Sequence, residues 1–366
     1  MNRIRRLGRK LLLGLLRFWP EGRGGTVGAW QSVLVIRMDD RVGNLLLTTP
    51  LLSALRHHFP AARIGLVCAA RQARAIEGTG LYDDLWRFEK RDLWRRPWRF
   101  LAWSVALRRA KYDLAIEAGH FHAFSFTGGA LAVWSRAPVR IGHRRGESAR
   151  LLTHAVEKDP EIVYDAAAKL ELLRPLLTEL PGEVPPLSSR LGSSRAEATR
   201  AELGEALVVY PGGRKRDHRW IEAGFHAAVA SLVAEFGWRA WIAWGPGEES
   251  LARSLAIRCG AELLPPTDLD ALAAAFRASR LVLTNDTGPM HLAVAVGAPT
   301  VGILLAADGA RWASPQGNFR AVQVAARPVA EVVAEIVGSA RQLVTEDRAG
   351  VNRSWSARAE DPALAR

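Results

Sequence analysis

Short apolar runs alternate along this chain with longer segments in which apolar residues recur every three or four positions. The short runs are bounded by Gly, Pro, Asn or Asp and are typical of buried strands, whereas the periodic segments are typical of helices. The expected strands cover residues 33–37, 64–67, 85–88, 112–118, 139–142, 206–210, 240–244, 262–264, 281–284 and 299–303. Helices are expected from residue 49, from residue 289, and over 97–109, 166–177, 221–236, 248–258, 269–278 and 329–344. This alternation predicts an α/β fold built on parallel, doubly wound sheets.

The length of the chain, 366 residues, exceeds what one hydrophobic core usually supports and predicts two domains. Residues 181–195 are rich in Pro, Gly and Ser, as linkers are, and separate two similar series of strands and helices. We therefore expect two Rossmann-like domains, residues 31–180 and 196–345. Residues 1–30 form a separate basic segment, and residues 346–366 are expected to be a disordered tail.

The formal net charge of +13 is the unusual feature of the composition, and it predicts an anionic partner. Zinc-finger spacing, an aromatic RNA-binding strand motif and a helix-turn-helix pattern are all absent from the sequence, so nucleic acid is not expected. Phosphorylated small molecules and an anionic membrane surface are the expected partners. Cys68 and Cys259 lie far apart, which excludes a disulfide framework and favours a reducing cytosol.

The first twenty residues combine leucines and aromatics with six cations that precede the first acid, Glu21. The stretch is too short and too interrupted to span a bilayer. We expect a basic amphipathic helix that lies on an anionic cytoplasmic leaflet. Two alternatives stay open: a helix packed on the fold with a solvated basic face, and a signal peptide, although Arg17 breaks the apolar stretch and no cleavage site follows.

The segment 281–303, LVLTNDTGPMHLAVAVGAPTVGI, reads as a strand, a polar turn, a helix and a second strand. The turn lies where a helix begins, and unpaired backbone N–H groups there favour an anion. Thr287 is suited to the N-cap, Gly288 permits close approach of a ligand, and His291 can add a donor. The alternative is that the turn only caps the helix, as any α/β protein requires.

Two further loops are expected beyond the carboxyl ends of strands, where ligands bind to open α/β sheets. The first, PGGRKRDHRW, places cations beside a double-glycine bend and suits a pyrophosphate, unless it is simply a solvated basic loop. Its candidate ligand contacts are Gly212, Gly213, Lys215, His218 and Arg219. In the second loop, residues 245–249, Glu248, or else Glu249, is a candidate acceptor for ribose hydroxyls, although acids are common at helix starts because of the helix dipole.

Two motifs, VLVIRMDDRVGNLLLTTPLL near residue 32 and NDTGPMHLAVAVGAPTVGI near residue 285, resemble those of glycosyltransferase family 9, the ADP-heptose:lipopolysaccharide heptosyltransferases. YPGGRKRDHRW and RIGHRR add weaker support. The resemblance spans roughly residues 32–340. It implies a GT-B fold, with two domains facing a central cleft, and an enzyme that transfers heptose, or a related sugar, from ADP-heptose to a phosphorylated lipopolysaccharide core. It also implies inversion at the anomeric carbon and a peripheral position on the cytoplasmic face of the inner membrane.

The resemblance assigns the donor-binding motif to Asp286, Thr287, Gly288 and His291, with Asp286 accepting hydrogen bonds from the sugar. The family often has lysine where this chain has His218, and here Lys215 or Arg219 can supply that charge. The residues expected to bind the acceptor are Arg37, Arg41 and Arg144. Neither a cofactor nor a metal ion is implied, and His57, His58, His120 and His122 are interpreted as incidental.

The chain departs from the family at Asn44, where the usual residue is an aspartate thought to deprotonate the acceptor hydroxyl. A carboxamide cannot act as a base. Asp40 is the favoured replacement and Asp39 the alternative, while both also suit turn chemistry or ion pairs with Arg37 and Arg41. Asn44 can instead orient the hydroxyl while a phosphate takes the proton.

Because of Asn44, an alternative function stays open: the chain is a non-catalytic homologue that binds nucleotide sugars or serves as an assembly partner in lipopolysaccharide biosynthesis. A third possibility is another nucleotide-sugar enzyme, a hydrolase or an epimerase. A Rossmann-type epimerase would need a glycine-rich motif after the first strand, and residues 38–44 lack it.

Overall fold

The computed structural model describes residues 27–122 and 125–348. The expected amphipathic helix in residues 1–30 and the expected tail in residues 346–366 therefore lie almost wholly outside the described residues. The chain divides into two compact units, with the boundary between Pro185 and Pro186 inside the expected linker. Two short pieces from the N-terminal half, Arg41–Leu47 and Arg74–Gly78, belong to the second unit, a division that the sequence pattern does not predict.

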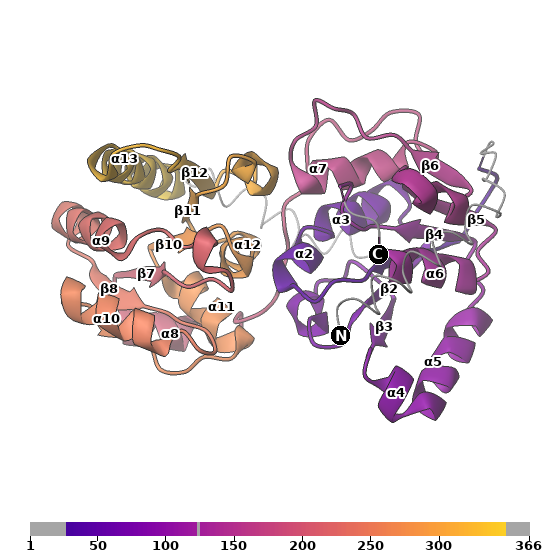
Figure 1. Cartoon of the computed structure of the whole chain (residues 1–366), viewed down its shortest axis with the longest axis horizontal. Helices are drawn as coiled ribbons and strands as arrows, with labels where there is room; N and C mark the ends of the chain where they lie inside the picture. Colours follow the sequence, from indigo (N-terminus) through magenta and orange to yellow (C-terminus); the bar gives the residue numbers. More distant parts are fainter. Residues whose placement is uncertain (1–26, 123–124, 349–366) are drawn as a thin grey trace. The chain divides into compact units, whose positions relative to one another are not determined.

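The first unit contains a six-stranded sheet in which every paired strand is parallel (Figure 1). Its strands are β1 (Ser32–Arg37), β2 (Arg63–Ala69), β3 (Asp84–Phe88), β4 (Leu114–Glu117), β5 (Val139–His143) and β6 (His154–Val156). Its α-helices are α3 (Thr49–His58), α4 (Asp92–Arg95), α5 (Pro97–Arg109), α6 (Phe126–Trp134) and α7 (Asp165–Leu170). The strand order is β3-β2-β1-β4-β5-β6.

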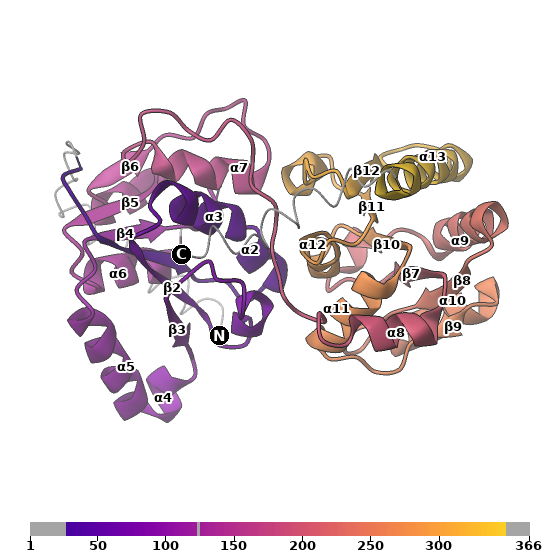
Figure 2. The same ribbon diagram turned by 180° about the vertical axis from the view of Figure 1, so that it is seen from behind.

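The second unit repeats this plan with a second parallel sheet, seen from behind in Figure 2. Its strands are β7 (Ala206–Tyr210), β8 (Arg239–Ile242), β9 (Glu262–Leu263), β10 (Leu281–Asn285), β11 (Thr300–Leu304) and β12 (Phe319–Gln323). Its α-helices are α2 (Val42–Leu46), α8 (Ala196–Leu203), α9 (Glu222–Phe236), α10 (Glu249–Cys259), α11 (Leu269–Ala278), α12 (Gly288–Ala295) and α13 (Val329–Arg348).

Both sheets have the same strand order once their strands are counted from the start of each unit, 3-2-1-4-5-6. This order reverses direction between the first and fourth strands, and ligands of open α/β sheets bind beyond the carboxyl ends of strands at that switch point. The switch points lie between β1 and β4 in the first unit and between β7 and β10 in the second. The topology therefore directs attention to the residues that follow these four strands.

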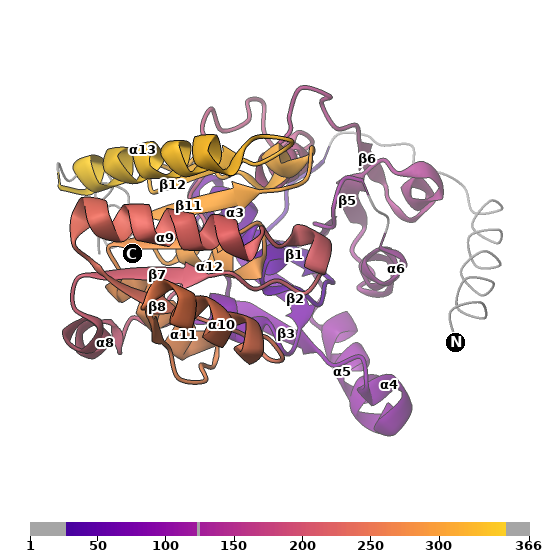
Figure 3. The same cartoon turned by 60° about the vertical axis from the view of Figure 1, so that its left-hand side comes forward.

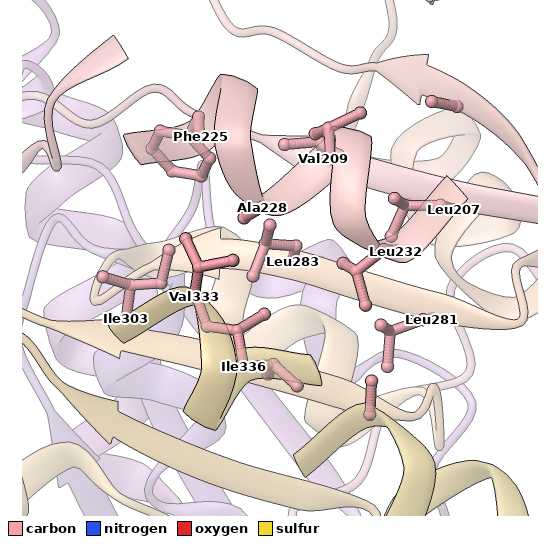
Figure 4. Close-up of a cluster of buried hydrophobic side chains, with 14 of the residues drawn as sticks. Leu207, Val209, Phe225, Ala228, Leu232, Leu281, Leu283, Ile303, Val333 and Ile336 are labelled. Carbon is pink, nitrogen blue, oxygen red and sulfur yellow. The ribbon is translucent and has the colours of Figure 1, made fainter. Parts of the chain in front are cut away.

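The core of the second unit lies between its sheet and the helices α9, α10 and α13, which run side by side in Figure 3. Leu207, Val209, Leu281 and Leu283 project from β7 and β10 toward helical residues such as Ile336 (Figure 4). Burying each such side chain stabilises the fold by about 1.5–3 kcal/mol. This core holds β7 and β10 rigidly, so the loops that follow them start from fixed positions.

Several expected elements differ from the observed ones. The helix expected over 166–177 ends at Leu170 and continues only as a 3-10 turn, Glu171–Leu173. Pro175 has no N–H group to bond to the carbonyl of Glu171, which prevents an α-helix from continuing regularly to residue 177. The sequence pattern also missed β6, β12, α4, α6 and α8.

The helix α2 replaces an expected turn over residues 38–44. Its sequence, VGNLL, contains poor helix formers, but four of its five residues are buried and it packs against α12 within the second unit. A methyl group at Gly43 would lie 2.6 Å from Cδ2 of His291, so only glycine allows this approach. Tertiary packing therefore determines α2. None of the helices in the described ranges is long and apolar enough to cross a bilayer.

Candidate functional site

Asn285, the last residue of β10, connects the two loops at the switch point of the second unit. Its side chain is fully buried; its Oδ1 accepts from the N–H of Trp220 at 3.0 Å, and its Nδ2 donates to the carbonyls of Pro211 at 2.7 Å and Gly212 at 3.2 Å. Three hydrogen bonds thus fix the loop after β7 against the turn after β10. Asn285 belongs to the motif 281–303 but was not among the residues predicted from the sequence to form the site.

Glu248 supports the same loop from the other side. Its Oε1 accepts from the N–H of Gly213 at 2.7 Å, and its Oε2 accepts from the Tyr210 hydroxyl at 2.9 Å and from the N–H of Gly245 at 3.1 Å. A methyl group at Gly212 would overlap this carboxylate. Both carboxylate oxygens are used by the loops, which gives Glu248 a positioning role. Its predicted contact with a ribose stays a prediction.

The turn Asp286–Gly288 leads directly into α12. Thr287 occupies the N-cap position with an extended backbone, but its side chain makes no capping bond and its hydroxyl donates instead to the carbonyl of Asn285 at 3.3 Å. No acceptor for the N–H groups of Thr287 and Gly288 is found within the described part of the chain, and Pro289 has no N–H. The amino end of α12 therefore presents unbonded backbone donors, the arrangement that binds phosphate groups.

Gly213 is followed by three exposed cations, Arg214, Lys215 and Arg216. The backbone of Gly213 lies against Thr287, since a methyl group added to Gly213 would be 2.9 Å from Cγ2 of Thr287. None of the three forms an ion pair with another described residue. Cations and bare amides thus lie at the same end of the sheet, which makes this region suited to a diphosphate.

Two of the residues predicted to bind the donor already have contacts within the second unit. The guanidinium of Arg219 donates to the carbonyl of Gly213 at 2.6 Å and pairs with Glu248 at 3.3 Å, so it is already used within the loop. His291 is buried, with its ring against Gly43 and 6.2 Å from the ring of Trp312, because α2 and the segment after β11 cover it. His218 is half-buried at the end of the basic loop.

The switch point of the first unit carries a network of buried charges. The carboxylate of Asp39 lies 3.4 Å from Nε2 of His120 and 3.7 Å from the guanidinium of Arg37, which connects the ends of β1 and β4. Nδ1 of His120 lies 3.0 Å from the carboxylate of Asp165, which also pairs with Lys169. His120 was interpreted as incidental from the sequence, since its contact with Asp165 joins residues 45 positions apart and no local pattern indicates it.

The pKa values of this network follow from its burial. Burial alone would raise the pKa of Asp165, but attraction to Lys169 and the hydrogen bond with His120 outweigh it and hold that pKa well below the usual range. Burial lowers the pKa of Lys169 to about 8, against the attraction of Asp165. Asp165 is therefore ionised at neutral pH, and its carboxylate favours the His120 tautomer with the proton on Nδ1. The unprotonated Nε2 then faces Asp39 and Arg37.

The remaining predicted residues of the N-terminal half occupy different environments. Asp40 is exposed, with no side-chain partner among the described residues, whereas Asn44 is buried in α2. Arg37 is buried and donates to the carbonyl of Ala118 at 2.9 Å, so its predicted contact with the acceptor would require it to leave this site.

The other two arginines predicted to bind the acceptor lie at the surface. Arg41 is exposed at the start of α2. Arg144 is exposed and pairs with Glu157 at 2.6 Å. Its neighbour Arg145, which the sequence analysis did not select, is buried against Glu117.

One group in the described ranges, His120, His122 and Asp165, brings three possible metal ligands within 4.8 Å of one another. Its carboxylate already pairs with Lys169, and Arg37 lies beside the same histidine. These cations oppose the binding of a further positive charge. The group is therefore better described as an ion-pair network than as a metal site.

The model of glycosyltransferase family 9 (heptosyltransferase) matches residues 101–336. The chain belongs to this family. Lipopolysaccharide heptosyltransferase 3 of Escherichia coli is 25% identical to it over 292 residues, which cover 76% of this chain and 84% of that protein.

Solved structures of family 9 share the fold. One from Veillonella parvula gives a TM-score of 0.69 at 19% identity and covers 88% of this chain and 100% of its own. An Escherichia coli heptosyltransferase solved with ADP gives 0.64 at 20% identity and covers 86% of this chain and 99% of its own. The predicted α/β architecture of GT-B type, with two doubly wound sheets, is confirmed.

Within this family 9 chain, Asp286 at the end of β10 offers a test of the site's electrostatics. Burial, with a smaller contribution from Asp308, raises the pKa of Asp286 to about 7. A carboxyl whose pKa rises on folding stabilises the folded state only while protonated; this contribution is complete below about pH 4 and is lost as the pH rises through 7. We expect Asp286→Asn to increase the free energy of unfolding by about 2–4 kcal/mol at pH 8 and to change it little at pH 4.

Urea unfolding at the two pH values measures this difference. Asp308→Asn serves as the control, because it removes only the smaller cause and should give a smaller gain at pH 8. Equal stability of Asp286→Asn and the parent protein at pH 8 would contradict the assigned pKa.

Proposed function

We propose that this chain is an inverting glycosyltransferase that moves heptose, or a related sugar, from an ADP-linked donor onto a phosphorylated lipopolysaccharide core. Family 9 membership supports the glycosyltransferase class. The name of the Escherichia coli relative, a lipopolysaccharide heptosyltransferase, supports the sugar and the acceptor, and the relative solved with ADP supports the nucleotide.

The observation that carries the proposal is the coupled pair of loops at the switch point between β7 and β10. The unbonded amides of Thr287 and Gly288 would hold the diphosphate, with Lys215 and its neighbouring arginines neutralising the charge. This is where an ADP leaving group gains negative charge during transfer, so fixed donors there stabilise the transition state more than the ground state. Asp286 would accept hydrogen bonds from the sugar.

In the proposed reaction Asp39 takes the proton of the acceptor hydroxyl. The hydroxyl oxygen forms a bond to the anomeric carbon on the face opposite the phosphate, and the bond from that carbon to the phosphate oxygen breaks with its electron pair leaving on ADP. Asp39 is favoured over Asp40 because its carboxylate lies 3.7 Å from the guanidinium of Arg37 at the switch point of the first unit, whereas the side chain of Asp40 is exposed and unsupported. Arg37 is the positioning residue in this scheme.

The acceptor and the location are further parts of the proposal. Arg41 and Arg144 are exposed cations that suit phosphates on a lipopolysaccharide core. Residues 1–30, with their cations and leucines, suit the anionic cytoplasmic leaflet of the inner membrane, where such an acceptor would be assembled. Neither a cofactor nor nucleic acid enters the scheme.

Incubation of the full chain with ADP-heptose and a truncated lipopolysaccharide core tests the activity. We expect sugar to be added to the core and ADP to be released only when both substrates are present. Release of ADP without acceptor would indicate a hydrolase. Binding of ADP without product would favour the non-catalytic homologue that Asn44 keeps open.

Calorimetry with ADP tests the donor site itself. Lys215→Ala is expected to weaken ADP binding about tenfold, because a charge-assisted contact to phosphate is lost. Arg341→Ala is the matched control: it removes an exposed cation of the same unit that pairs with Glu235 at 2.6 Å, and it should leave the affinity unchanged. Equal affinities of Lys215→Ala and the parent protein would remove this loop from the site.

A further inference from the structure

The helices α4 and α5, which connect β3 to β4, form a projection with an unusual surface. In all three ribbon views they extend away from the sheet of the first unit, beyond β3 (Figures 1, 2 and 3). Phe100, Trp103 and Leu107 attach α5 to the N-terminal core through contacts that include Phe88. This face of α5 accounts for its folding, and the functional site described above uses neither helix.

The other face of the projection is apolar and exposed to solvent. Trp94, Trp98 and Leu101 are 84%, 66% and 60% exposed. Trp98 and Leu101 recur at helical spacing with Ala102 and Val105, and these residues line one open depression along α5. Large apolar side chains that gather in one exposed patch indicate an interaction site, because soluble monomeric proteins rarely expose large contiguous apolar patches.

Cations surround this apolar face. Residues 89–111 contain eight lysines and arginines and only two acids, Glu89 and Asp92. The exposed cations of the projection are Lys90, Arg91, Arg95, Arg96, Arg99, Arg109 and Lys111. None of them pairs with a carboxylate elsewhere in the described ranges. Their charge is therefore available to an external partner.

The combination identifies the partner by its chemistry. Indole rings prefer the boundary between water and hydrocarbon, and arginine side chains extend from that depth to phosphate groups. A second copy of the chain would bring the same positive charge against this one and be repelled. A nucleic acid would match the cations but leave the leucine, alanine and valine positions of α5 without apolar contacts.

We propose that α4 and α5 dock this protein on a bilayer that contains anionic phospholipid, with Trp94, Trp98 and Leu101 inserted at the level of the headgroups. The arginines pair with lipid phosphates around them. This surface is distinct from residues 1–30 and does not rest on the proposed sugar-transfer activity. It orients the first unit at the membrane through a folded element.

A fluorescent label tests insertion at a single position of the full chain. Leu101→Cys and the control Ile257→Cys, a 76% exposed position on α10, each carry an environment-sensitive nitrobenzoxadiazole label in a Cys259→Ser background. Cys68 is buried and should not react. On addition of vesicles that contain phosphatidylcholine and the anionic lipid phosphatidylglycerol, we expect a blue shift and at least a twofold increase in emission at position 101 only. Vesicles of pure phosphatidylcholine should give a much smaller change.

A label at position 101 that stays in water while the protein floats with the vesicles would overturn the proposal and leave residues 1–30 as the anchor. A change that depends on protein concentration without vesicles would indicate self-association instead, and a change on addition of RNA would indicate nucleic acid. Trp94→Ser with Trp98→Ser should lower the vesicle-bound fraction at least fivefold at low lipid, and Ile257→Ser should not lower it.

Discussion

Asn285→Ala is expected to destabilise the protein by about 3–5 kcal/mol and to abolish measurable ADP binding. The substitution removes three hydrogen bonds and leaves the N–H of Trp220 and the carbonyl of Pro211 buried without partners, at about 1–3 kcal/mol each. The loop after β7 would no longer be held against the amino end of α12. Urea unfolding measures the stability, and calorimetry on the folded variant measures ADP binding.

Asn318→Ala is the matched control for Asn285. Asn318 is also a buried asparagine of the second unit, and its Nδ2 donates to the carbonyls of Val294 and Ala298, each at 3.1 Å. It should lose a similar amount of stability but retain ADP affinity wherever it is folded. Asn285→Asp keeps the acceptor for Trp220 but cannot donate to Pro211, so an affinity equal to that of the parent protein would show that the loops need no such connection.

Asp39→Asn is expected to lower kcat for sugar transfer by about 10²–10⁴-fold, the range typical of a lost general base, with little change in ADP affinity. The asparagine is the same size, and its side-chain oxygen can still lie near the guanidinium of Arg37, which is 3.7 Å from the carboxylate of Asp39, so the fold should be retained. Asp40→Asn is the control: its side chain is exposed and unsupported, and the variant should transfer sugar at close to the parent rate.

A reversed outcome, with Asp40→Asn inactive and Asp39→Asn active, would return the role of base to Asp40. Restoration of the family aspartate in Asn44→Asp separates the remaining cases. A large gain in rate would show that the natural chain lacks an efficient base and would argue against Asp39. An unchanged or lower rate is expected, because Asn44 is buried in α2 and an ionised carboxylate there would be desolvated.

The sequence pattern predicted regular elements well where local chemistry was decisive. The strand 206–210 and the helices 97–109 and 269–278 have the expected bounds. Helix 269–278 begins where the side chain of Asp268 accepts from the N–H of Ala271 at 2.8 Å, a signal contained in four consecutive residues. By contrast, α2 was missed because its stability comes from packing on α12, about 245 positions later in the chain.

The candidate site shows the same division. The turn at Asp286–Gly288 was predicted because a strand end, a glycine and a helix start follow one another in the sequence. The direction in which each neighbouring side chain points was not predictable. Arg219 and Glu248 were each predicted to contact the donor, and the structure also pairs them with each other across 29 positions of the chain.

Local sequence therefore determined most of the strands, most of the helices and the α/β class, and it indicated the turn of the proposed anion site, because each depends on the chemistry of neighbouring residues. Folding decided which polar groups remain for a ligand. Asn285 and Trp220 are 65 positions apart, and His120 and Asp165 are 45 apart. Only the packing of the parallel sheets brings such groups within hydrogen-bonding distance, and a buried polar group takes whichever partner that packing provides.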